Sequence, residues 1–380
     1  MIYLDSAAGA KPYPEVIEVI TDVLTNNWAN ASSNYELGDK SKMLINEVTQ
    51  MVADDINCKP EEIIWTSGGC ESNSMAIVGT LKMHPHMHLI TTHLEHTSIY
   101  ETIKNNLGTP ITFLKNDHQG FIHLGYMNWK LRELAYRCGG NFLVSISGAN
   151  SEVGSIQDIK TISEIVHSHG GLLHIDATQL YVEKPIDVQE LGIDLMTVSG
   201  QKIHCCKGVG FLYVKEGIKI APIIYGSQQE GLRGGTLPNH LIAAFGKALE
   251  VTRKNDTYSR VNSLRNRLLS QLTNIPNVRL NGPEIGENRL CNNISLIVEG
   301  VSAESLVAQC SLLGVMLNKG SACQSYNPEP SKTLKAIGLS DEEAFSTIRL
   351  SLDEFMTEED IDMAANIITK VIERMRSIDV

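Results

Sequence analysis

A lysine and an aspartate, each placed just after an apolar run, are the residues of this chain with the clearest potential for chemistry. Lys202 lies between the apolar run 195–198 and the β-rich run 210–214, so we expect it on a turn between two strands. Asp176 ends another apolar run, 172–175. Pyridoxal phosphate needs an amine for its Schiff base and a carboxylate for its pyridinium nitrogen. The pair therefore predicts a pyridoxal phosphate site.

Strands that alternate with helices would position this pair. Between residues 60 and 215, strand-like runs such as 62–66, 88–92 and 141–147 alternate with segments of helical periodicity. This pattern predicts an α/β fold whose large domain has a mostly parallel sheet flanked by helices. Ligands bind at the carboxyl ends of strands in such sheets. The residues expected at those ends are Ser67, Gly68, Gly69, His96, Ser151, Asp176, Gln179 and Lys202.

A second, smaller domain is also expected. At 380 residues the chain exceeds the size at which a single hydrophobic core usually stops growing. The alternation of strands and helices loosens beyond residue 214, and the later segments favour an α+β arrangement. We place the large domain at residues 15–250, and we assign residues 1–14 and 251–380 to the small α+β domain.

Composition and charge narrow the function classes. The formal net charge is −12 with no basic run, which argues against a nucleic-acid partner. No apolar window approaches a membrane span and the first residues do not resemble a signal peptide, so no membrane is expected and we expect a cytoplasmic protein. The eight cysteines form no CxxC pair, and the histidines between 84 and 96 lack ligand-like spacing. We therefore expect reduced thiols and no metal.

Two loops of small residues add to the candidate site. Residues 67–69 link a predicted strand to a helix expected over residues 74–78, and backbone N–H groups at such a junction commonly hold phosphate. A tight turn without a ligand fits the same residues. Cys323 lies in the loop 319–325, far in sequence from Lys202. By itself it would be an ordinary packing residue.

Together, these segments make the chain resemble the cysteine desulfurases, which are fold-type I pyridoxal phosphate enzymes related to the class-V aminotransferases. The resemblance covers nearly the whole chain, and the matching segments follow the family's order. They are Tyr3-Leu4-Asp5-Ser6-Ala7-Ala8, Asn30-Ala31-Ser32-Ser33, Thr66-Ser67-Gly68-Gly69-Cys70-Glu71-Ser72-Asn73, Glu95-His96, Asp176-Ala177-Thr178-Gln179, Ser199-Gly200-Gln201-Lys202, Arg233-Gly234-Gly235-Thr236, Gly320-Ser321-Ala322-Cys323 and Ser346-Thr347-Ile348-Arg349.

The resemblance implies a role in cofactor binding for many of these residues. Lys202 would form the Schiff base and move protons at the substrate α-carbon, and Asp176 would keep the ring nitrogen protonated. His96 would stack on the ring and act as acid or base, and Gln179 would hydrogen-bond the ring oxygen. The remaining cofactor contacts would come from Ser67, Gly68, Gly69, Cys70, Ser151, Ser199, Gln201 and, across a homodimer, Thr236.

The reaction that the resemblance implies is the conversion of L-cysteine to L-alanine. Arg349 would hold the substrate carboxylate with its planar guanidinium, and Asn30 would lie near the substrate. The Cys323 thiolate would attack the substrate sulfur and keep it as a persulfide. The sulfur would then pass to an acceptor protein, such as an iron–sulfur scaffold. The sequence does not name the acceptor or separate cysteine from selenocysteine.

Five positions depart from the family's pattern. Gln201 stands where a histidine is usual, Cys70 replaces a threonine and Ser151 replaces an asparagine. Cys205-Cys206 replaces a Gly-Pro pair. These changes predict weaker or differently tuned cofactor binding, or a specialised acceptor. The two cysteines would relay sulfur, bind metal or, as most buried cysteines do, simply pack.

Two other functions fit the same sequence. One is another pyridoxal phosphate-dependent lyase or aminotransferase of this fold, in which Cys323 is idle. The other is a non-catalytic relative that retains the fold to bind a sulfur acceptor, for which the departures at positions 70, 151 and 201 are the support.

Overall fold

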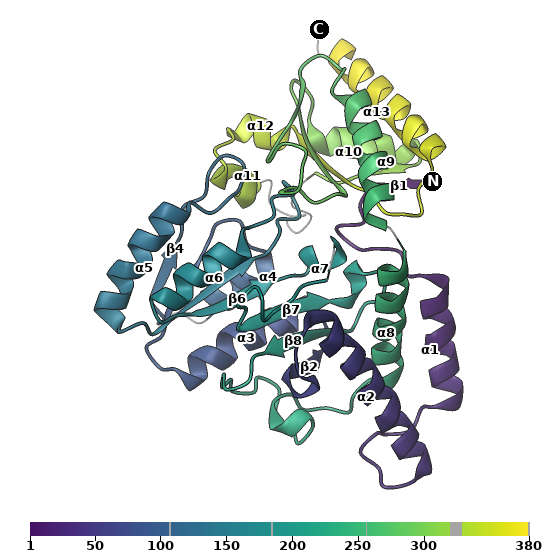
Figure 1. Cartoon of the computed structure of the whole chain (residues 1–380). Helices are drawn as coiled ribbons and strands as arrows, with labels where there is room; N and C mark the ends of the chain where they lie inside the picture. The colour runs from purple at the N-terminus through teal and green to yellow at the C-terminus, as the bar shows by residue number, and fades with distance from the viewer. Residues whose placement is uncertain (106–107, 184, 256, 320–328, 379–380) are drawn as a thin grey trace.

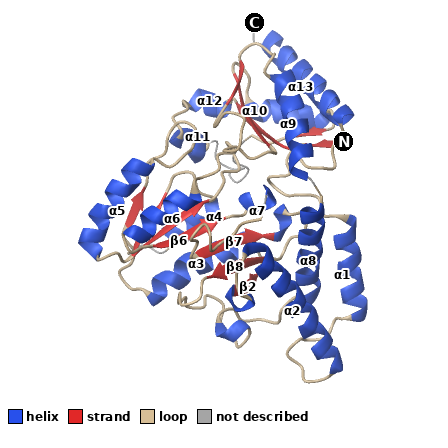
Figure 2. Ribbon diagram, in the orientation of Figure 1, coloured by secondary structure: helices blue, strands red, loops and turns tan. Residues whose placement is uncertain are grey.

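A seven-stranded sheet forms the centre of the molecule (Figures 1 and 2). The computed structural model describes residues 1–105, 108–183, 185–255, 257–319 and 329–378. The strand order is β2-β8-β7-β6-β5-β3-β4, and β8 alone runs antiparallel to its neighbours within this described sheet. The strands are β2 (Ile63–Thr66), β3 (His88–Thr91), β4 (Ile111–Phe113), β5 (Phe142–Ser147), β6 (Leu172–Asp176), β7 (Leu195–Ser199) and β8 (Gly210–Val214). The predicted mostly parallel sheet is confirmed.

Helices cover both faces of this sheet, because successive side chains of a strand point to opposite faces. Trp65 and Phe211 pack into the core on one face, whereas their neighbours Ile64 and Leu212 pack into the core on the other. The helices of this region are α1 (Pro14–Asn26), α2 (Glu36–Ile56), α3 (Gly69–Met83), α4 (Thr97–Lys104), α5 (Leu124–Cys138), α6 (Ile159–Ser168), α7 (Leu180–Glu183) and α8 (Asn239–Lys254). Strands β7 and β8 are buried throughout, as expected for strands covered on two sides.

The ends of several helices follow from local sequence. Pro14 occupies the first turn of α1, where its missing N–H costs nothing. The Asp158 side chain accepts a hydrogen bond from the Thr161 N–H and caps α6. Gly139 adopts the left-handed conformation that ends α5. These signals fix where the chain leaves each helix and returns to the sheet.

A smaller α+β unit lies at the end of the molecule that carries both termini (Figure 1). Its antiparallel sheet has the order β12-β10-β9, and a short parallel pair joins β1 to β11. Its elements are β1 (Ile2–Tyr3), α9 (Thr257–Leu272), β9 (Val278–Leu280), β10 (Asn293–Val298), α10 (Ala303–Leu312), β11 (Val315–Met316), α11 (Lys332–Ala336), α12 (Asp341–Phe345), β12 (Thr347–Ser351) and α13 (Glu358–Ile378). This unit has its own apolar core, which includes Leu4.

The break between these two cores falls between α8 and α9, close to the predicted boundary at residue 250. The assignment of residues 15–250 to one domain, and of residues 1–14 and 251–380 to the other, stays a prediction. Three short 3₁₀ helices complete the described elements: η1 (Pro60–Glu62), η2 (Gly200–Lys202) and η3 (Gln229–Gly231).

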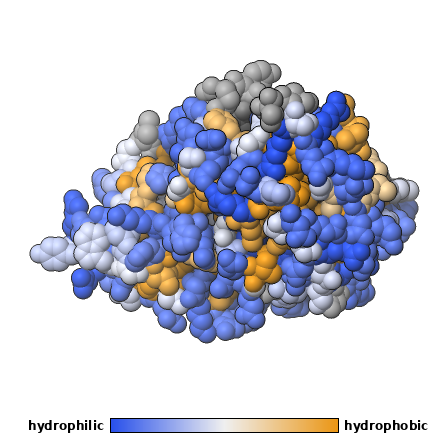
Figure 3. Space-filling model, turned by 90° about the horizontal axis from the view of Figure 1, so that it is seen from above, coloured by the Kyte–Doolittle hydropathy of each residue, from blue (hydrophilic) through white to orange (hydrophobic). Residues whose placement is uncertain are grey.

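The face of the molecule seen in Figure 3 is mostly hydrophilic. Seen from above in Figure 3, apolar residues form small groups between polar ones. Within the described ranges, no helix has the length and apolar character that crossing a membrane requires.

Candidate active site

A cavity of about 290 Å³ opens at the carboxyl ends of β5, β6 and β7, whose last residues all line it. This edge of the sheet is where parallel α/β folds bind ligands. The predicted site residues that line it are Gly69, Cys70, His96, Ser151, Asp176, Gln179, Ser199, Gln201, Lys202 and Arg349. Residues Ser67, Gly68, Asn30 and Thr236 do not line it. Cys323 lies outside the described residues.

Lys202 ends the 3₁₀ helix η2 between β7 and β8, which agrees with the predicted turn. Its Nζ donates hydrogen bonds to the backbone oxygens of Ala7, at 2.6 Å, and Ala8, at 2.8 Å. Burial, with a smaller contribution from the Arg349 charge, lowers the pKa of the Lys202 amine to about 8. A larger fraction of this amine is therefore neutral, and nucleophilic, at physiological pH than is usual for a lysine.

Asp176 presents a buried carboxylate at the end of β6. It accepts hydrogen bonds from the Asn73 side chain, at 2.7 Å, and from the Thr178 N–H, at 3.0 Å. His174, two residues earlier on the strand, is also buried, and burial lowers the pKa of its imidazole to about 4. Both hydrogen-bond donors to Asp176, the Asn73 amide and the Thr178 N–H, are neutral, so a protonated ring nitrogen would add a positive charge beside the carboxylate.

The start of α3 forms a cradle next to Ser199. The helix begins at Gly69, earlier than the predicted start at Ser74, because Gly68 adopts a φ of 141° that favours glycine. A Cβ atom on Gly69 would lie 3.3 Å from Thr178 Oγ1 and 3.6 Å from Ser199 Cβ. Thr178 Oγ1 is buried and has no hydrogen-bond partner among the described residues. A small anion would find backbone N–H groups and this hydroxyl there.

Arg233 belongs to the segment 233–236, whose Thr236 is expected to contact the cofactor across a homodimer, but its side chain is engaged within its own chain. Its guanidinium makes two hydrogen bonds to the Glu71 carboxylate on the first turn of α3, at 2.7 and 3.2 Å. Glu71 also accepts the Ser67 N–H at 2.8 Å. The ion pair therefore fixes the 233–236 loop beside the start of α3, whereas Thr236 itself lies outside the cavity of its own chain.

His96 caps α4 from the rim of the cavity. Its Nδ1 accepts a hydrogen bond from the Ser98 N–H at 3.1 Å and lies 2.8 Å from Ser98 Oγ. When the ring is neutral, an accepting Nδ1 places its proton on Nε2. The side chain is exposed, so Nε2 is free to exchange protons with a bound molecule.

Arg349 reaches the cavity from β12 of the smaller unit and is almost completely buried. One terminal nitrogen donates to Asp5 Oδ1 at 2.7 Å, and the other oxygen of Asp5 accepts from the Asn318 side chain at 2.9 Å. The Arg349 Nε is buried without a hydrogen-bond partner in the described part of the chain. An unpaired buried donor of a guanidinium suits a carboxylate ligand.

Two buried carboxyl groups beside the cavity were not predicted. Glu95 accepts hydrogen bonds from the N–H and hydroxyl of Ser147, both at 2.7 Å, and burial raises the pKa of its carboxyl to about 7. Glu152 accepts the Ser331 hydroxyl at 2.5 Å, and burial raises its pKa as well. Because Glu95 and Glu152 are adjacent in sequence to the predicted site residues His96 and Ser151, the sequence could have indicated that they lie near the site. Asn73, Thr178 and Asp5 lie within matching segments but had no assigned role.

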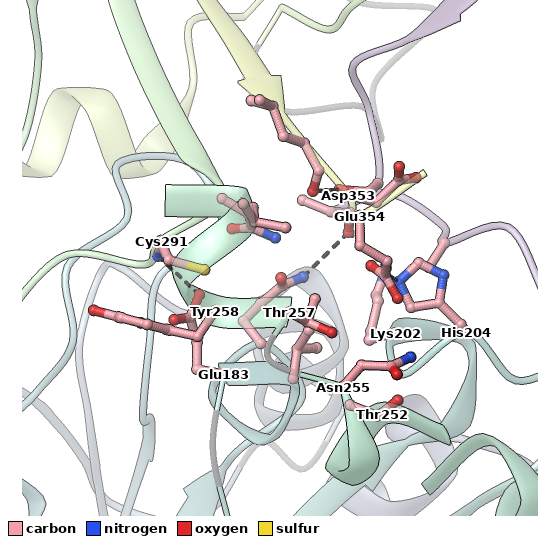
Figure 4. Close-up of a pocket in the computed structure, with 18 of the residues that line it drawn as sticks. Glu183, Lys202, His204, Thr252, Asn255, Thr257, Tyr258, Cys291, Asp353 and Glu354 are labelled. Carbon is pink, nitrogen blue, oxygen red and sulfur yellow. Dashed lines mark hydrogen bonds and ion pairs between the residues drawn. The ribbon is translucent and has the colours of Figure 1, made fainter. Parts of the chain in front are cut away.

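A second cavity, of about 320 Å³, lies beside the first and shares Ala7, Gln179 and Lys202 with it (Figure 4). His204 Nε2 lies 3.2 Å from the Glu354 carboxylate, which also accepts the hydroxyl of Tyr13. These contacts join the Lys202 turn to the N-terminal segment and to the segment after β12. They stabilise the lining of the second cavity, to which His204 and Glu354 both belong.

The low pKa of Lys202 predicts a pH-dependent rate of cofactor attachment. Only the neutral amine attacks an aldehyde, so the rate should rise with pH up to about 8 and level off above it. An ordinary lysine would show a rise that continues beyond pH 10. The measurement is the rate at which absorbance changes when pyridoxal phosphate is added to cofactor-free protein at a series of pH values. A rise that continues to pH 10 would show that burial does not tune this amine.

The residues present fit pyridoxal phosphate. Lys202 offers the amine, and Asp176 offers a carboxylate whose two hydrogen-bond donors, from Asn73 and Thr178, are neutral. The cradle at Gly69 also contains the buried Thr178 hydroxyl, which has no hydrogen-bond partner among the described residues. Each of these features matches one part of the cofactor: the aldehyde, the ring nitrogen and the phosphate. Cys70 and Gln201, which depart from the family's pattern, line the same cavity.

Comparisons with known proteins agree with this fit. Residues 2–363 match the model of the aminotransferase class-V family. Cysteine desulfurase IscS 1 of Archaeoglobus fulgidus is 36% identical, over 99% of this chain and 98% of its own length. Cysteine desulfurase IscS of Clostridium botulinum (strain Hall) is 35% identical, over 99% and 95%.

Solved structures give the same result. A structure titled NifS-like protein superposes with a TM-score of 0.90 at 26% identity, covering 98% of this chain and 99% of its own. The NifS-like protein from Rickettsia africae gives a TM-score of 0.89 at 28% identity, with the same coverage. SspA in complex with cysteine gives 0.81 at 29% identity, covering 93% and 99%. The chain therefore belongs to the class-V aminotransferase family and, within it, to the cysteine desulfurases.

Proposed function

We propose that this chain is a pyridoxal phosphate-dependent cysteine desulfurase that converts L-cysteine to L-alanine and passes the sulfur through a Cys323 persulfide to an acceptor. The observation that carries the proposal is a single cavity lined by the amine of Lys202, the carboxylate of Asp176 and the guanidinium of Arg349. The amino group of an amino acid substrate would bind beside the Lys202 amine, and the carboxylate of the substrate would bind the Arg349 guanidinium. The similarity to proteins named cysteine desulfurase supports the choice of substrate.

Each side chain has a task in this reaction. The bound cofactor supplies a conjugated ring that withdraws electrons from the substrate α-carbon. The Lys202 amine takes and returns the proton at that carbon, which its lowered pKa favours. Asp176 holds the positive charge of the ring nitrogen, and His96 acts as acid or base at its Nε2, because its Nδ1 already accepts the Ser98 N–H. Arg349 orients the substrate through its carboxylate.

The role of Cys323 rests on the sequence of its loop and on the residues that flank it. Asn318, before the loop, donates to Asp5, the partner of Arg349, and Ser331, after it, donates to Glu152. These two described residues, Asn318 and Ser331, therefore contact residues that belong to the cavity or support it. The thiolate of Cys323 attacks the substrate sulfur, so that a sulfur–sulfur bond forms while the carbon–sulfur bond breaks. The electron pair of the broken bond stays on carbon, which takes up a proton to give alanine.

The partners that we propose are a sulfur-acceptor protein, such as an iron–sulfur scaffold, and a second copy of the chain. The similarity to proteins named cysteine desulfurase supports the first, because the sulfur held on Cys323 has to leave before the next turnover. For the homodimer, the support is that the 233–236 loop is anchored by Glu71 while Thr236 stays outside its own chain's cavity, so Thr236 would serve a neighbouring subunit. We propose a cytoplasmic location for the chain, since no apolar window approaches a membrane span and reduced thiols are expected.

Mass spectrometry after incubation with L-cysteine tests the proposed function. The peptide that contains Cys323 should gain one sulfur atom, and Cys323→Ser should lower catalytic alanine formation by at least about 10³-fold, because the acceptor of the substrate sulfur is gone. Cys138→Ser is the matched control, since this half-buried cysteine lies on α5 and does not line the cavity. Full alanine turnover in Cys323→Ser would instead favour a lyase in which Cys323 is idle. No turnover in the native chain would favour the non-catalytic alternative.

A further inference from the structure

Two adjacent cysteines occupy the turn that directly follows Lys202. The sulfur atoms of Cys205 and Cys206 are 3.7 Å apart and in hydrogen-bond contact. We propose that this pair is a site of reversible oxidation, at which a small-molecule disulfide converts the two thiols into a disulfide between neighbouring residues. The proposal concerns the turn itself and does not depend on which substrate the enzyme uses.

The two thiols differ in exposure and in pKa, and these differences indicate which thiol attacks and which thiol resolves the first product. Cys205 is buried, 1% exposed, whereas Cys206 is only partly buried and is the one that a reagent can reach. The hydrogen bond from the Cys205 thiol lowers the pKa of the Cys206 thiol, and the same hydrogen bond together with burial raises the pKa of Cys205. Cys206 is therefore the attacking thiolate, and Cys205 is the thiol that resolves the first product.

The reaction is two successive thiol–disulfide exchanges. The Cys206 thiolate attacks one sulfur of glutathione disulfide, which forms a mixed disulfide and releases one glutathione thiolate. Cys205 then loses its proton to water and attacks the Cys206 sulfur, which releases the second glutathione. Two protein thiols are oxidised and one disulfide is reduced to two thiols. The sulfur–sulfur distance must shorten from 3.7 Å to about 2.05 Å.

This shortening has to move the turn that carries Lys202. The N–H groups of Ile203 and Cys205 both donate to the Gly200 oxygen, so Cys205 is hydrogen-bonded to the 3₁₀ helix that ends in Lys202. The same turn accepts hydrogen bonds from the N-terminal segment, through the oxygens of Gln201 and His204. Oxidation should therefore change the environment of Lys202, and the absorbance of the attached cofactor should report this change.

The experiment treats the purified holoenzyme with glutathione disulfide, blocks remaining thiols in denaturant and digests with trypsin. Cleavage after Lys202 and Lys207 places both cysteines on the peptide 203–207. We expect this peptide to be about two mass units lighter than the reduced form and to carry no blocked thiol. The cofactor absorbance should shift at the same time, and dithiothreitol should reverse both changes.

Two variants test which cysteine attacks the disulfide reagent and which cysteine resolves the mixed disulfide. Cys205→Ser lacks the resolving thiol, so Cys206 should keep glutathione as a stable mixed disulfide. Cys206→Ser lacks the accessible thiol, so Cys205 should stay unmodified. The proposal is wrong if the native peptide keeps two free thiols, or if it carries the same glutathione adduct as Cys205→Ser. If the buried Cys205→Ser variant does not fold, the mass of the native peptide 203–207 and the modification state of Cys205 in Cys206→Ser still test the proposal.

Discussion

Replacing Lys202 by alanine should remove covalent cofactor attachment and lower alanine formation from cysteine by at least about 10³-fold. Lys202 is the lysine that lines the cavity in the described part of the chain, and the pKa of its amine is lowered to about 8. No other group at this position can both bind the cofactor's aldehyde and move the α-proton. The measurements are the absorbance spectrum of the purified protein and the rate of alanine release.

Lys207→Ala is the matched control for this prediction. Lys207 lies on the same turn but is exposed and does not line the cavity, so its variant should keep native absorbance and turnover. Circular dichroism on both variants separates chemistry from folding, because Lys202→Ala also removes the lysine donor from the backbone oxygens of Ala7, which keeps the Gln179 side chain as a donor, and Ala8. Retained cofactor attachment in Lys202→Ala would mean that another residue carries the cofactor.

The pairing of Lys202 with Asp176 was predictable because each residue follows an apolar run that forms a buried strand. Strands β6 and β7 are parallel neighbours, so their carboxyl ends meet at one edge of the sheet. The pattern of apolar runs therefore located this part of the cavity without any knowledge of tertiary contacts. The same pattern predicted the α/β class, since alternating strands and helices leave few other arrangements.

The contacts between distant segments were not predictable. Asp5 and Arg349 are 344 residues apart in sequence, and they meet because the N-terminal segment lies alongside β12. Asn73 reaches Asp176 across 103 residues. No local periodicity encodes such pairs. The start of α3 was misplaced for a related reason: the left-handed backbone of Gly68 lets the helix begin within a segment that reads as a loop.

Arg349→Lys should raise the KM for cysteine by about 10²-fold while kcat falls much less. The Arg349 guanidinium binds Asp5 with one terminal nitrogen and leaves its buried Nε unpaired, so it can hold a carboxylate and keep its own anchor. A lysine ammonium is a point charge that has to choose between the two. The measurement is steady-state alanine formation over a range of cysteine concentrations.

Asp5→Asn should show a smaller rise in the KM than Arg349→Lys, and Arg279→Lys is the matched control. Asp5→Asn keeps an acceptor for Arg349 but removes the charge that orients it, so the KM should rise in the same direction by about 10-fold. Arg279→Lys alters an exposed arginine that pairs with Glu299 and Glu343 on the surface, and it should leave the KM unchanged. An unchanged KM in Arg349→Lys would mean that the substrate carboxylate binds elsewhere in the cavity. A KM that rises equally in Asp5→Asn and Arg349→Lys would mean that orientation by Asp5, rather than the shape of the guanidinium, determines how tightly the substrate binds.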